Sequence, residues 1–247
     1  MMKTASYTYG NESPAQELTL FLPDGEIKSV FVYIHGGGLV DGDKSHADVS
    51  APYLTSRGIA LATINYRMYP EAKYPDFIYD SALAVRWVAD NVCKVYGADK
   101  LYVGGSSAGG YISMMLCYDK TYLESVGLDM SAIAGYFHDA GQPTAHFTVL
   151  DKRGIDPRRI IVDETSPLYH IGTADKYPRC RFIISDNDMP SRYEQTMLVL
   201  STLKHYGHSN YDHVVMHGDH CAYVTATDEN GDGVLGRMIY DFIESAE

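Results

Sequence analysis

The residues best suited to covalent chemistry lie in the stretch GSSAG, residues 105–109, whose central residue is Ser107. The stretch has the pattern Gly-x-Ser-x-Gly, with a strand-like apolar run before it and a helical pattern after it. Glycines two positions before and after a serine permit a tight strand-to-helix turn that exposes the serine hydroxyl group. This context predicts that Ser107 is a nucleophile. A glycine-rich turn that binds a phosphate group is the alternative.

A serine hydroxyl group becomes a useful nucleophile only when a base takes its proton and a carboxylate orients that base. In a fold built around this motif, the chain order is serine, acid, histidine. After the last strand-like run, the loop residue His220 is the predicted base, whereas His217 is expected at the strand end in a structural role. The preceding run is followed by two possible acids, Asp186 and Asp188. We favour Asp188 because it lies beyond the expected strand end.

The stretch HGGG, residues 35–38, follows the apolar run SVFVYI. Three consecutive glycines cost a folding chain much backbone entropy, so their presence needs a reason. Attack on an acyl carbon creates an oxyanion, and loss of one hydrogen-bond donor to it costs about 3–4 kcal/mol. We expect the backbone N–H groups of Gly37 and Gly38, with that of Ala108 beside the nucleophile, to form the oxyanion hole.

The elements that must position these residues are strand-length apolar runs that alternate with helical patterns. The runs from residue 29 onward are nearly continuous, as in strands buried on both faces. The alternation predicts an α/β fold, with a mostly parallel sheet and helices on both faces. The strand-like runs cover residues 17–22, 29–34, 59–66, 100–105, 132–137, 181–185 and 211–216. The helical patterns cover about residues 76–96, 108–117, 191–206 and 233–245.

Residues 139–178 interrupt this alternation with prolines, mixed charge and weak periodicity. A connector of about 40 residues is longer than two neighbouring elements need. We interpret it as a small cap-like insertion that crosses the open end of the sheet and helps to shape a pocket. The whole chain, residues 1–247, is then expected to form a single domain.

Composition limits the classes of partner. The chain has 20 Lys and Arg against 32 Asp and Glu, a formal net charge of −12, which argues against nucleic acid or an anionic membrane as partner. The start of the sequence has no signal-peptide pattern, and no apolar run reaches the length of a membrane span. We therefore expect a cytoplasmic protein that binds a small molecule. No feature of the sequence indicates an oligomeric state.

Other features suggest metals only weakly. The stretch DENGDG, residues 228–233, matches half of an EF-hand loop, but Ile239 stands where that loop needs a glutamate. Four cysteines are scattered without a metal-binding spacing and are expected as buried free thiols. The sequence therefore predicts neither a metal nor a cofactor. His138 and Asp139 are possible pocket residues. The histidines considered and set aside as metal ligands are His205, His208, His213 and His217.

Taken together, the chain from about Gln16 resembles the α/β-hydrolase superfamily, and within it the hormone-sensitive-lipase-like esterases. The segments that carry the resemblance are HGGG (35–38), NYRMYPEAKYP (65–75), GSSAGG (105–110), DNDMP (186–190) and HGDHCAY (217–223). The resemblance implies an α/β-hydrolase fold and an esterase activity.

The chain departs from that group in two places. Ser106 stands where many members have an acidic residue, and the region before the first strand is too short for a large helical cap. A compact, small-cap member is therefore indicated, with an open pocket for short or small acyl groups. Its compact relatives resemble feruloyl and acetyl-xylan esterases or arylformamidases, although HGGGLV departs from the HGGYW-like form of the arylformamidases.

The expected function is that of a serine hydrolase, a carboxylesterase with a Ser-His-Asp triad and an acyl-enzyme intermediate. An amidase, a peptidase or an arylformamidase-like hydrolase with the same triad is one alternative. A catalytically inactive binding protein on the same fold is another. A phosphate- or nucleotide-binding protein is disfavoured, because the P-loop lysine and the dinucleotide fingerprint are missing from the sequence.

Overall fold

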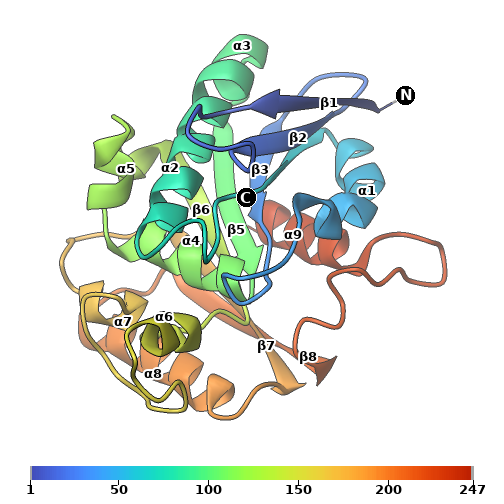
Figure 1. The fold of residues 1–247 in the computed structure, drawn as a ribbon. Helices are drawn as coiled ribbons and strands as arrows, with labels where there is room; N and C mark the ends of the chain where they lie inside the picture. Colours follow the sequence, from blue (N-terminus) through green and yellow to red (C-terminus); the bar gives the residue numbers. More distant parts are fainter. Residues whose placement is uncertain (1, 246–247) are drawn as a thin grey trace.

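The computed structural model describes residues 2–245. Within that range an eight-stranded sheet has the strand order β1-β2-β4-β3-β5-β6-β7-β8 (Figure 1). Pairing is parallel from β4 through β3 to β8, whereas β1 and β2 join the sheet antiparallel. The strands are β1 (Lys3–Thr8), β2 (Glu17–Leu22), β3 (Ser29–Ile34), β4 (Ile59–Ile64), β5 (Lys100–Ser106), β6 (Ile133–Asp139), β7 (Arg179–Asn187) and β8 (Tyr211–Asp219). The predicted mostly parallel α/β sheet is confirmed.

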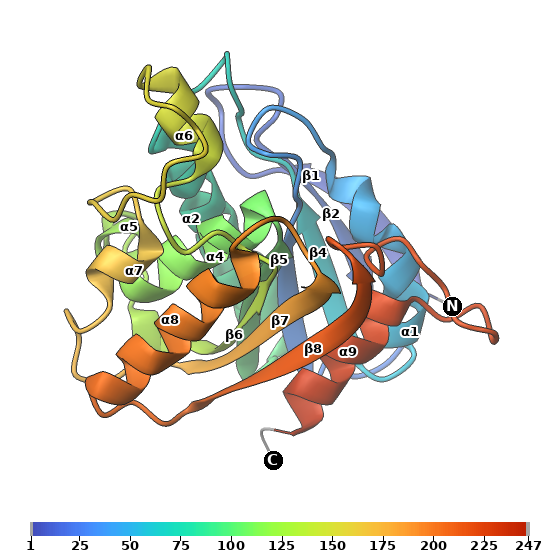
Figure 2. The same cartoon turned by 90° about the horizontal axis from the view of Figure 1, so that it is seen from below.

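Helices cover both faces of the sheet, as the continuous apolar strands predict. Figure 2 shows α2, α4 and α8 on one face and α1 and α9 on the other. Each face has its own apolar cluster, and the consecutive β3 residues Phe31 and Val32 belong to different clusters. The helices are α1 (Ala51–Thr55), α2 (Asp76–Val88), α3 (Lys94–Tyr96), α4 (Ala108–Tyr118), α5 (Thr121–Ser125), α6 (Phe147–Lys152), α7 (Pro167–His170), α8 (Arg192–His205) and α9 (Val234–Glu244). Shorter pieces are the 3-10 helices η1 (Lys44–Ser50) and η3 (Met130–Ala132) and the π-helix η2 (Ala89–Cys93).

Several elements differ from the sequence-based prediction. The edge strand β1 was not predicted, because its residues are all exposed and carry no apolar alternation. The short helices between residues 44 and 55 were also missed. The predicted helix over residues 76–96 is instead three consecutive pieces, since a π-helix separates α2 from α3. Its predicted end is confirmed: Gly97 closes α3 in the left-handed conformation, with φ 70°.

The segment between β6 and β7 contains two short helices, α6 and α7, although its sequence indicated no clear element. It is joined to the loop after β3, because the Thr148 hydroxyl donates to the Gly38 carbonyl at 2.6 Å. It is also joined to α4, because the Tyr111 hydroxyl donates to the Thr165 carbonyl at 2.7 Å. The segment therefore packs over the end of the sheet at which β3 and β5 terminate.

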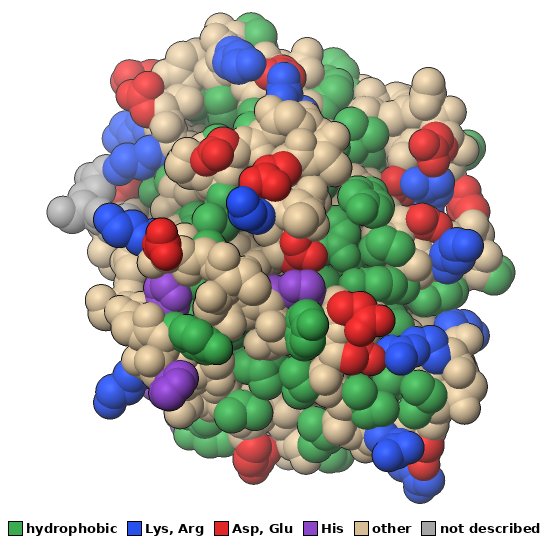
Figure 3. Space-filling model, turned by 90° about the vertical axis from the view of Figure 1, so that its left-hand side faces the viewer, with side chains coloured by type: hydrophobic (Ala, Val, Ile, Leu, Met, Phe, Trp, Pro, Cys, Tyr) green, Lys and Arg blue, Asp and Glu red, His purple; other side chains and the backbone are tan. Residues whose placement is uncertain are grey.

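Charged side chains of both signs are interspersed on the surface drawn in Figure 3. The negative net charge therefore does not produce a uniformly acidic surface on that face. Among residues 2–245, no helix combines the length and the apolar character needed to cross a membrane.

The parallel strands bring four loops together at their carboxyl ends. In the register, Ile34 of β3 lies opposite Gly105 of β5, and Ser106 lies opposite Asp139 of β6. At the other side of the sheet, Asn187 of β7 lies opposite Asp219 of β8. The loops after β3, β5, β7 and β8 therefore begin at the same edge of the sheet.

The first turn of α4 packs unusually close to β3. A Cβ atom added at Gly109 would lie 1.9 Å from the Ile34 carbonyl oxygen, and one at Gly105 would lie 2.4 Å from the same atom. These neighbours are backbone atoms, which cannot rotate away as a side chain can. Glycine at both positions is therefore required for the helix to begin directly against the sheet.

Substitution of Gly109 by alanine is expected to lower the free energy of unfolding by about 3 kcal/mol or more, because the new methyl group overlaps the β3 backbone. Gly25→Ala is the matched control, since a Cβ atom there meets nothing within 4 Å. Urea denaturation of both variants measures the effect. Equal unfolding midpoints would show that the helix does not need this close approach.

Candidate active site

Ser107 lies between β5 and α4 in a strained backbone conformation, with φ 57° and ψ −114°. A non-glycine residue in such a region costs roughly 1–3 kcal/mol and persists only when its surroundings hold it. Its N–H group donates to the Asp139 carbonyl at 2.8 Å, and its own carbonyl accepts from the Tyr111 N–H group at 2.9 Å. The turn therefore holds the Ser107 side chain at the helix N-terminus, beyond the end of β5.

His220 follows β8 and contacts both partners that the sequence suggested. Its Nε2 atom lies 2.9 Å from Ser107 Oγ, and its Nδ1 atom lies 2.6 Å from Asp188 Oδ1. The structure thus brings together three residues that are far apart in sequence: Asp188 follows Ser107 by 81 positions, and His220 follows Asp188 by 32. In this order the imidazole can take the proton of the serine hydroxyl group, and the carboxylate can orient the imidazole and stabilise its charged form.

Asp188 is held in place by more than the histidine. Its side chain is 2% exposed, and it accepts the Met189 N–H group at 2.6 Å. Burial by itself raises the pKa of this carboxyl, but the hydrogen bonds from His220 and Met189 outweigh it and the pKa is lowered. Asp188 is therefore an ionised carboxylate at neutral pH.

Asp186, the alternative acid, lies inside β7 and points to a different histidine. It accepts from His217 Nδ1 at 2.5 Å and from the Gly218 N–H group at 2.9 Å. The His217 side chain is 95% exposed, so this pair lies at the surface. The structure therefore places Asp186 with His217, and Asp188 with His220.

The glycines after β3 line the same cavity as the serine and the histidine. Gly37 and Gly38 have φ values of 114° and 64°, which favour glycine, and a Cβ atom at Gly37 would lie 1.8 Å from the Asp41 carbonyl oxygen. The cavity has a volume of about 370 Å³. Its lining consists of Gly36, Gly37, Gly38, His46, Ser106, Ser107, Met189, His220, Cys221, Val224 and Thr225.

His35 stabilises the loop that contains Gly36, Gly37 and Gly38. Its ring stacks on Tyr66 with centroids 4.4 Å apart, and Nδ1 lies 2.6 Å from the Gly36 carbonyl oxygen. Burial lowers the pKa of His35 to about 4, so the neutral ring donates its Nδ1 proton to that carbonyl. This contact fixes the backbone of the loop at the point where it leaves β3.

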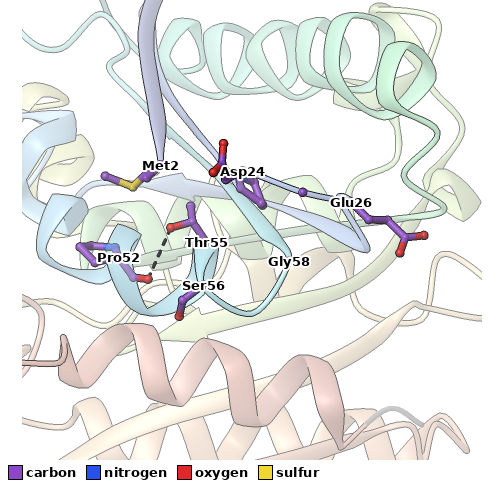
Figure 4. A pocket seen from close by; sticks show the side chains of 9 residues that line it. Met2, Asp24, Glu26, Pro52, Thr55, Ser56 and Gly58 are labelled. Carbon is purple, nitrogen blue, oxygen red and sulfur yellow. Dashed lines mark hydrogen bonds between the residues drawn. The ribbon is translucent and has the colours of Figure 1, made fainter.

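A larger cavity, of about 460 Å³, lies elsewhere and is drawn in Figure 4. Its lining residues include Glu26 and Gly58, which precede β3 and β4, so it lies at the amino ends of the parallel strands. Figure 4 shows that the Thr55 hydroxyl group donates a hydrogen bond to the Pro52 carbonyl. This hydroxyl group is therefore not paired with a side chain that could act as a general base. The smaller cavity is therefore the candidate active site, because it contains the serine and the histidine.

Asp139 does not line the candidate site, contrary to the expectation that it and His138 are pocket residues. Both side chains are buried. The Asp139 carboxylate accepts the hydroxyl groups of Ser106 and Tyr223, and Tyr33 donates to Ser106 Oγ at 2.9 Å. Ser106 replaces the acidic residue that the resemblance leads one to expect, and Asp139 on the adjacent strand supplies a carboxylate at its side.

Two residues of this region were not predicted from the sequence. Tyr223 belongs to the loop that carries His220, and only the fold brings it to Asp139. Arg192, the first residue of α8, is 4% exposed and donates to the Ala140 carbonyl at 2.5 Å. Its guanidinium group adds positive charge near the Asp188 carboxylate. Neither role has a local sequence signal, because both depend on contacts between distant segments.

The stretch DENGDG, residues 228–233, forms a hydrogen-bonded turn. The Asp228 side chain accepts the N–H groups of Asn230 and Asp232 and pairs with Arg237, as expected for a solvated turn. Of the four cysteines, all within the described range, Cys117 and Cys180 are buried; every one is a free thiol.

Known proteins of similar sequence or structure include several esterases. The probable isoprenylcysteine alpha-carbonyl methylesterase ICMEL2 of Arabidopsis thaliana is 31% identical over 145 residues, covering 55% of this chain and 34% of that protein. The esterase LipI of Mycobacterium tuberculosis is 37% identical over 97 residues, covering 38% of this chain and 30% of that protein. The matches thus span about a third of the length of these relatives.

Solved structures share the fold over almost the whole chain. Esterase B from Lactobacillus rhamnosis has a TM-score of 0.78 at 20% identity, covering 99% of this chain and 86% of that one. Butyrate-bound Est2 from Thermogutta terrifontis has a TM-score of 0.77 at 17% identity, covering 98% and 94%. The fold is therefore that of the α/β hydrolases. The model of the BD-FAE family matches residues 18–225, and the chain belongs to that family.

Proposed function

We propose that the protein hydrolyses carboxylic esters, with Ser107 as nucleophile, His220 as general base and Asp188 as the residue that orients the histidine. The observation that carries the proposal is the pair of hydrogen bonds at His220, 2.9 Å to Ser107 Oγ and 2.6 Å to Asp188 Oδ1. Both lie within the reach that proton transfer requires.

In the first half of the reaction, His220 takes the Ser107 proton while Oγ attacks the ester carbonyl carbon. The resulting oxyanion accepts hydrogen bonds from the backbone N–H groups of Gly37, Gly38 and Ala108. Collapse of the intermediate breaks the bond to the leaving alkoxide, which takes the proton from His220. In the second half, His220 removes a proton from water, and the resulting hydroxide attacks the acyl carbon. When the bond to Ser107 Oγ breaks, His220 returns this proton to Oγ, and the carboxylic acid is released.

Short or small acyl groups are the proposed substrates. The cavity is about 370 Å³, and none of its lining residues comes from the segment between β6 and β7, whose helices α6 and α7 have six and four residues. The relatives named above are esterases, and one neighbour of the same fold binds butyrate. A cavity of this size favours a small acyl group over a long lipid chain.

Asp139 is proposed as a positioning residue for both the turn that carries Ser107 and the loop that carries His220. Its carbonyl holds the Ser107 N–H group at 2.8 Å, and its carboxylate accepts the Tyr223 hydroxyl from the loop that carries His220. One buried residue thus connects the nucleophile turn to the base. Burial raises the pKa of Asp139 to about 6, despite the hydrogen bonds from Ser106 and Tyr223.

Replacement of Ser107 by alanine is expected to lower kcat for p-nitrophenyl acetate by about 10⁴-fold or more, because no other group can form the acyl-enzyme. The wild type should cleave the acetate and butyrate esters faster than the palmitate ester. Ser201→Ala, an exposed serine of α8, is the control and should keep full activity.

Full activity of the Ser107 variant would exclude the proposed nucleophile. Faster cleavage of a p-nitroanilide than of the matching ester would reassign the protein to the amidases. Circular dichroism of each variant verifies that the fold is intact.

The two aspartates provide a second test. Asp188→Asn is expected to lower kcat by roughly 10³- to 10⁴-fold, because an amide neither orients the imidazole nor stabilises its charged form. Asp186→Asn should change kcat less than about 3-fold, since its partner His217 lies at the surface. Steady-state kinetics of both variants decide between them, and the reverse ranking would make Asp186 the triad acid.

Asp139 predicts a pH effect on stability. Its pKa is about 6 in the folded protein and near 4 in an unfolded chain, so between these values the folded state binds more protons. The free energy of unfolding therefore falls as pH rises through this window. Asp139→Asn removes this dependence, so the stability of the wild type relative to the variant should decrease by roughly 2–3 kcal/mol between about pH 4 and pH 7.

Urea denaturation across this pH range measures the difference. Asp99→Asn, which replaces an exposed aspartate, is the matched control and should run parallel to the wild type. A constant difference between the wild type and the Asp139 variant would mean that folding does not raise the pKa of Asp139.

A further inference from the structure

A second group of side chains, of types that can bind a metal ion, lies in the core beneath α4, away from the cavity of the candidate active site. Cys117 comes from the last turn of α4, His138 from β6 and Cys180 from β7. Cys117 is 0%, His138 1% and Cys180 2% exposed. One ligand atom from each residue lies within 4.8 Å of the other two. The proposed ester hydrolysis uses none of them.

The spacing of the two sulfur atoms fits a shared metal ion. Cys117 Sγ and Cys180 Sγ are 3.7 Å apart, far beyond the bond length of a disulfide. A tetrahedral zinc ion with Zn–S bonds of about 2.3 Å places two thiolates roughly 3.8 Å apart. The sulfur atoms can therefore bind one ion without displacement of the backbone.

His138 is oriented as a metal ligand usually is. Its Nδ1 atom lies 2.9 Å from Ser113 Oγ, and its Nε2 atom is buried without a hydrogen-bond partner in residues 2–245. Metal-binding histidines commonly use one ring nitrogen for the ion and the other for such a hydrogen bond. The Tyr118 hydroxyl likewise donates to Cys180 Sγ at 3.8 Å, a contact that a metal-bound thiolate can retain.

Charge and ligand chemistry favour zinc among the possible ions. Thiolate and imidazole ligands select zinc or copper(I) over calcium and magnesium. Two thiolates neutralise a divalent ion, whereas copper(I) would leave a net negative charge, and an uncompensated charge is costly in a core. Aromatic rings surround the group, with Tyr136 and Phe182 centred 5.6 and 5.0 Å from the His138 ring.

We propose that Cys117, His138 and Cys180 form a buried zinc site that joins α4 to β6 and β7. Three protein ligands leave one position of a tetrahedral ion for a water molecule. The role would be structural, because all three ligands are buried and none of them lines the cavity of the candidate active site. Two of the elements that the ion would join lead to that site, since α4 begins beside Ser107 and β6 ends at Asp139. The ion would hold together the elements from which the active-site residues project. This site is independent of the proposed esterase function.

The test is the metal content of the full chain, expressed in zinc-supplemented medium and purified without chelators. Mass spectrometry of the metal should find about one zinc ion per wild-type chain and less than about a tenth in Cys117→Ser and His138→Gln. Cys93→Ser is the matched control, because Cys93 is a half-buried thiol outside the group and should leave the zinc content unchanged.

Cobalt provides a second readout that needs no variant. The wild type loaded with cobalt(II) should show thiolate-to-cobalt charge-transfer absorption, and removal of zinc should lower the melting temperature of the wild type and of Cys93→Ser. A wild type that holds less than about a tenth of a zinc ion per chain and shows no such absorption would overturn the proposal. Recovery of a Cys117–Cys180 disulfide from the wild type would overturn it as well.

Discussion

The site depends on one short contact, the hydrogen bond from the Ser107 N–H group to the Asp139 carbonyl at 2.8 Å. Ser107 has φ 57°, which a serine adopts only when its neighbours compensate the strain. The contact joins β5 to β6 where both strands end, and the glycines at 105 and 109 allow α4 to begin at once against β3. The serine side chain is thereby directed into the cavity instead of along the sheet.

The Asp139 side chain adds a second set of contacts to the one that its backbone carbonyl makes. Its carboxylate accepts hydrogen bonds from the hydroxyl group of Ser106, which precedes Ser107, and from that of Tyr223, on the loop of His220. It is buried and its pKa is raised to about 6, whereas the pKa of Asp188 is lowered. The pKa values of two neighbouring carboxyl groups thus shift in opposite directions because their surroundings differ: Asp188 contacts the His220 ring, whereas Asp139 joins Ser106 to Tyr223.

The sequence predicts much of this arrangement, since the strand runs and the motifs around Ser107, Asp188 and His220 are local signals. It does not reveal the Asp139 network, because the pairing of Asp139 with Ser106 depends on the register of β5 and β6. The exposed strand β1 and the π-helix η2 also lack a periodic signal. The approach of Cys117 to Cys180, 63 positions away, requires α4 to pack on β6 and β7 to pair with β6.

The most direct test of the account is to identify the residue that a fluorophosphonate modifies. The reagent reacts with a serine hydroxyl group only where a base and an oxyanion hole activate it, so covalent labelling reports the whole arrangement at once. Peptide mass spectrometry of the labelled wild type is predicted to find a single adduct, on Ser107, that is lost when His220 is replaced by alanine. An adduct on another residue, or an unlabelled protein that still hydrolyses esters, would contradict the central role of the Ser107–His220 contact.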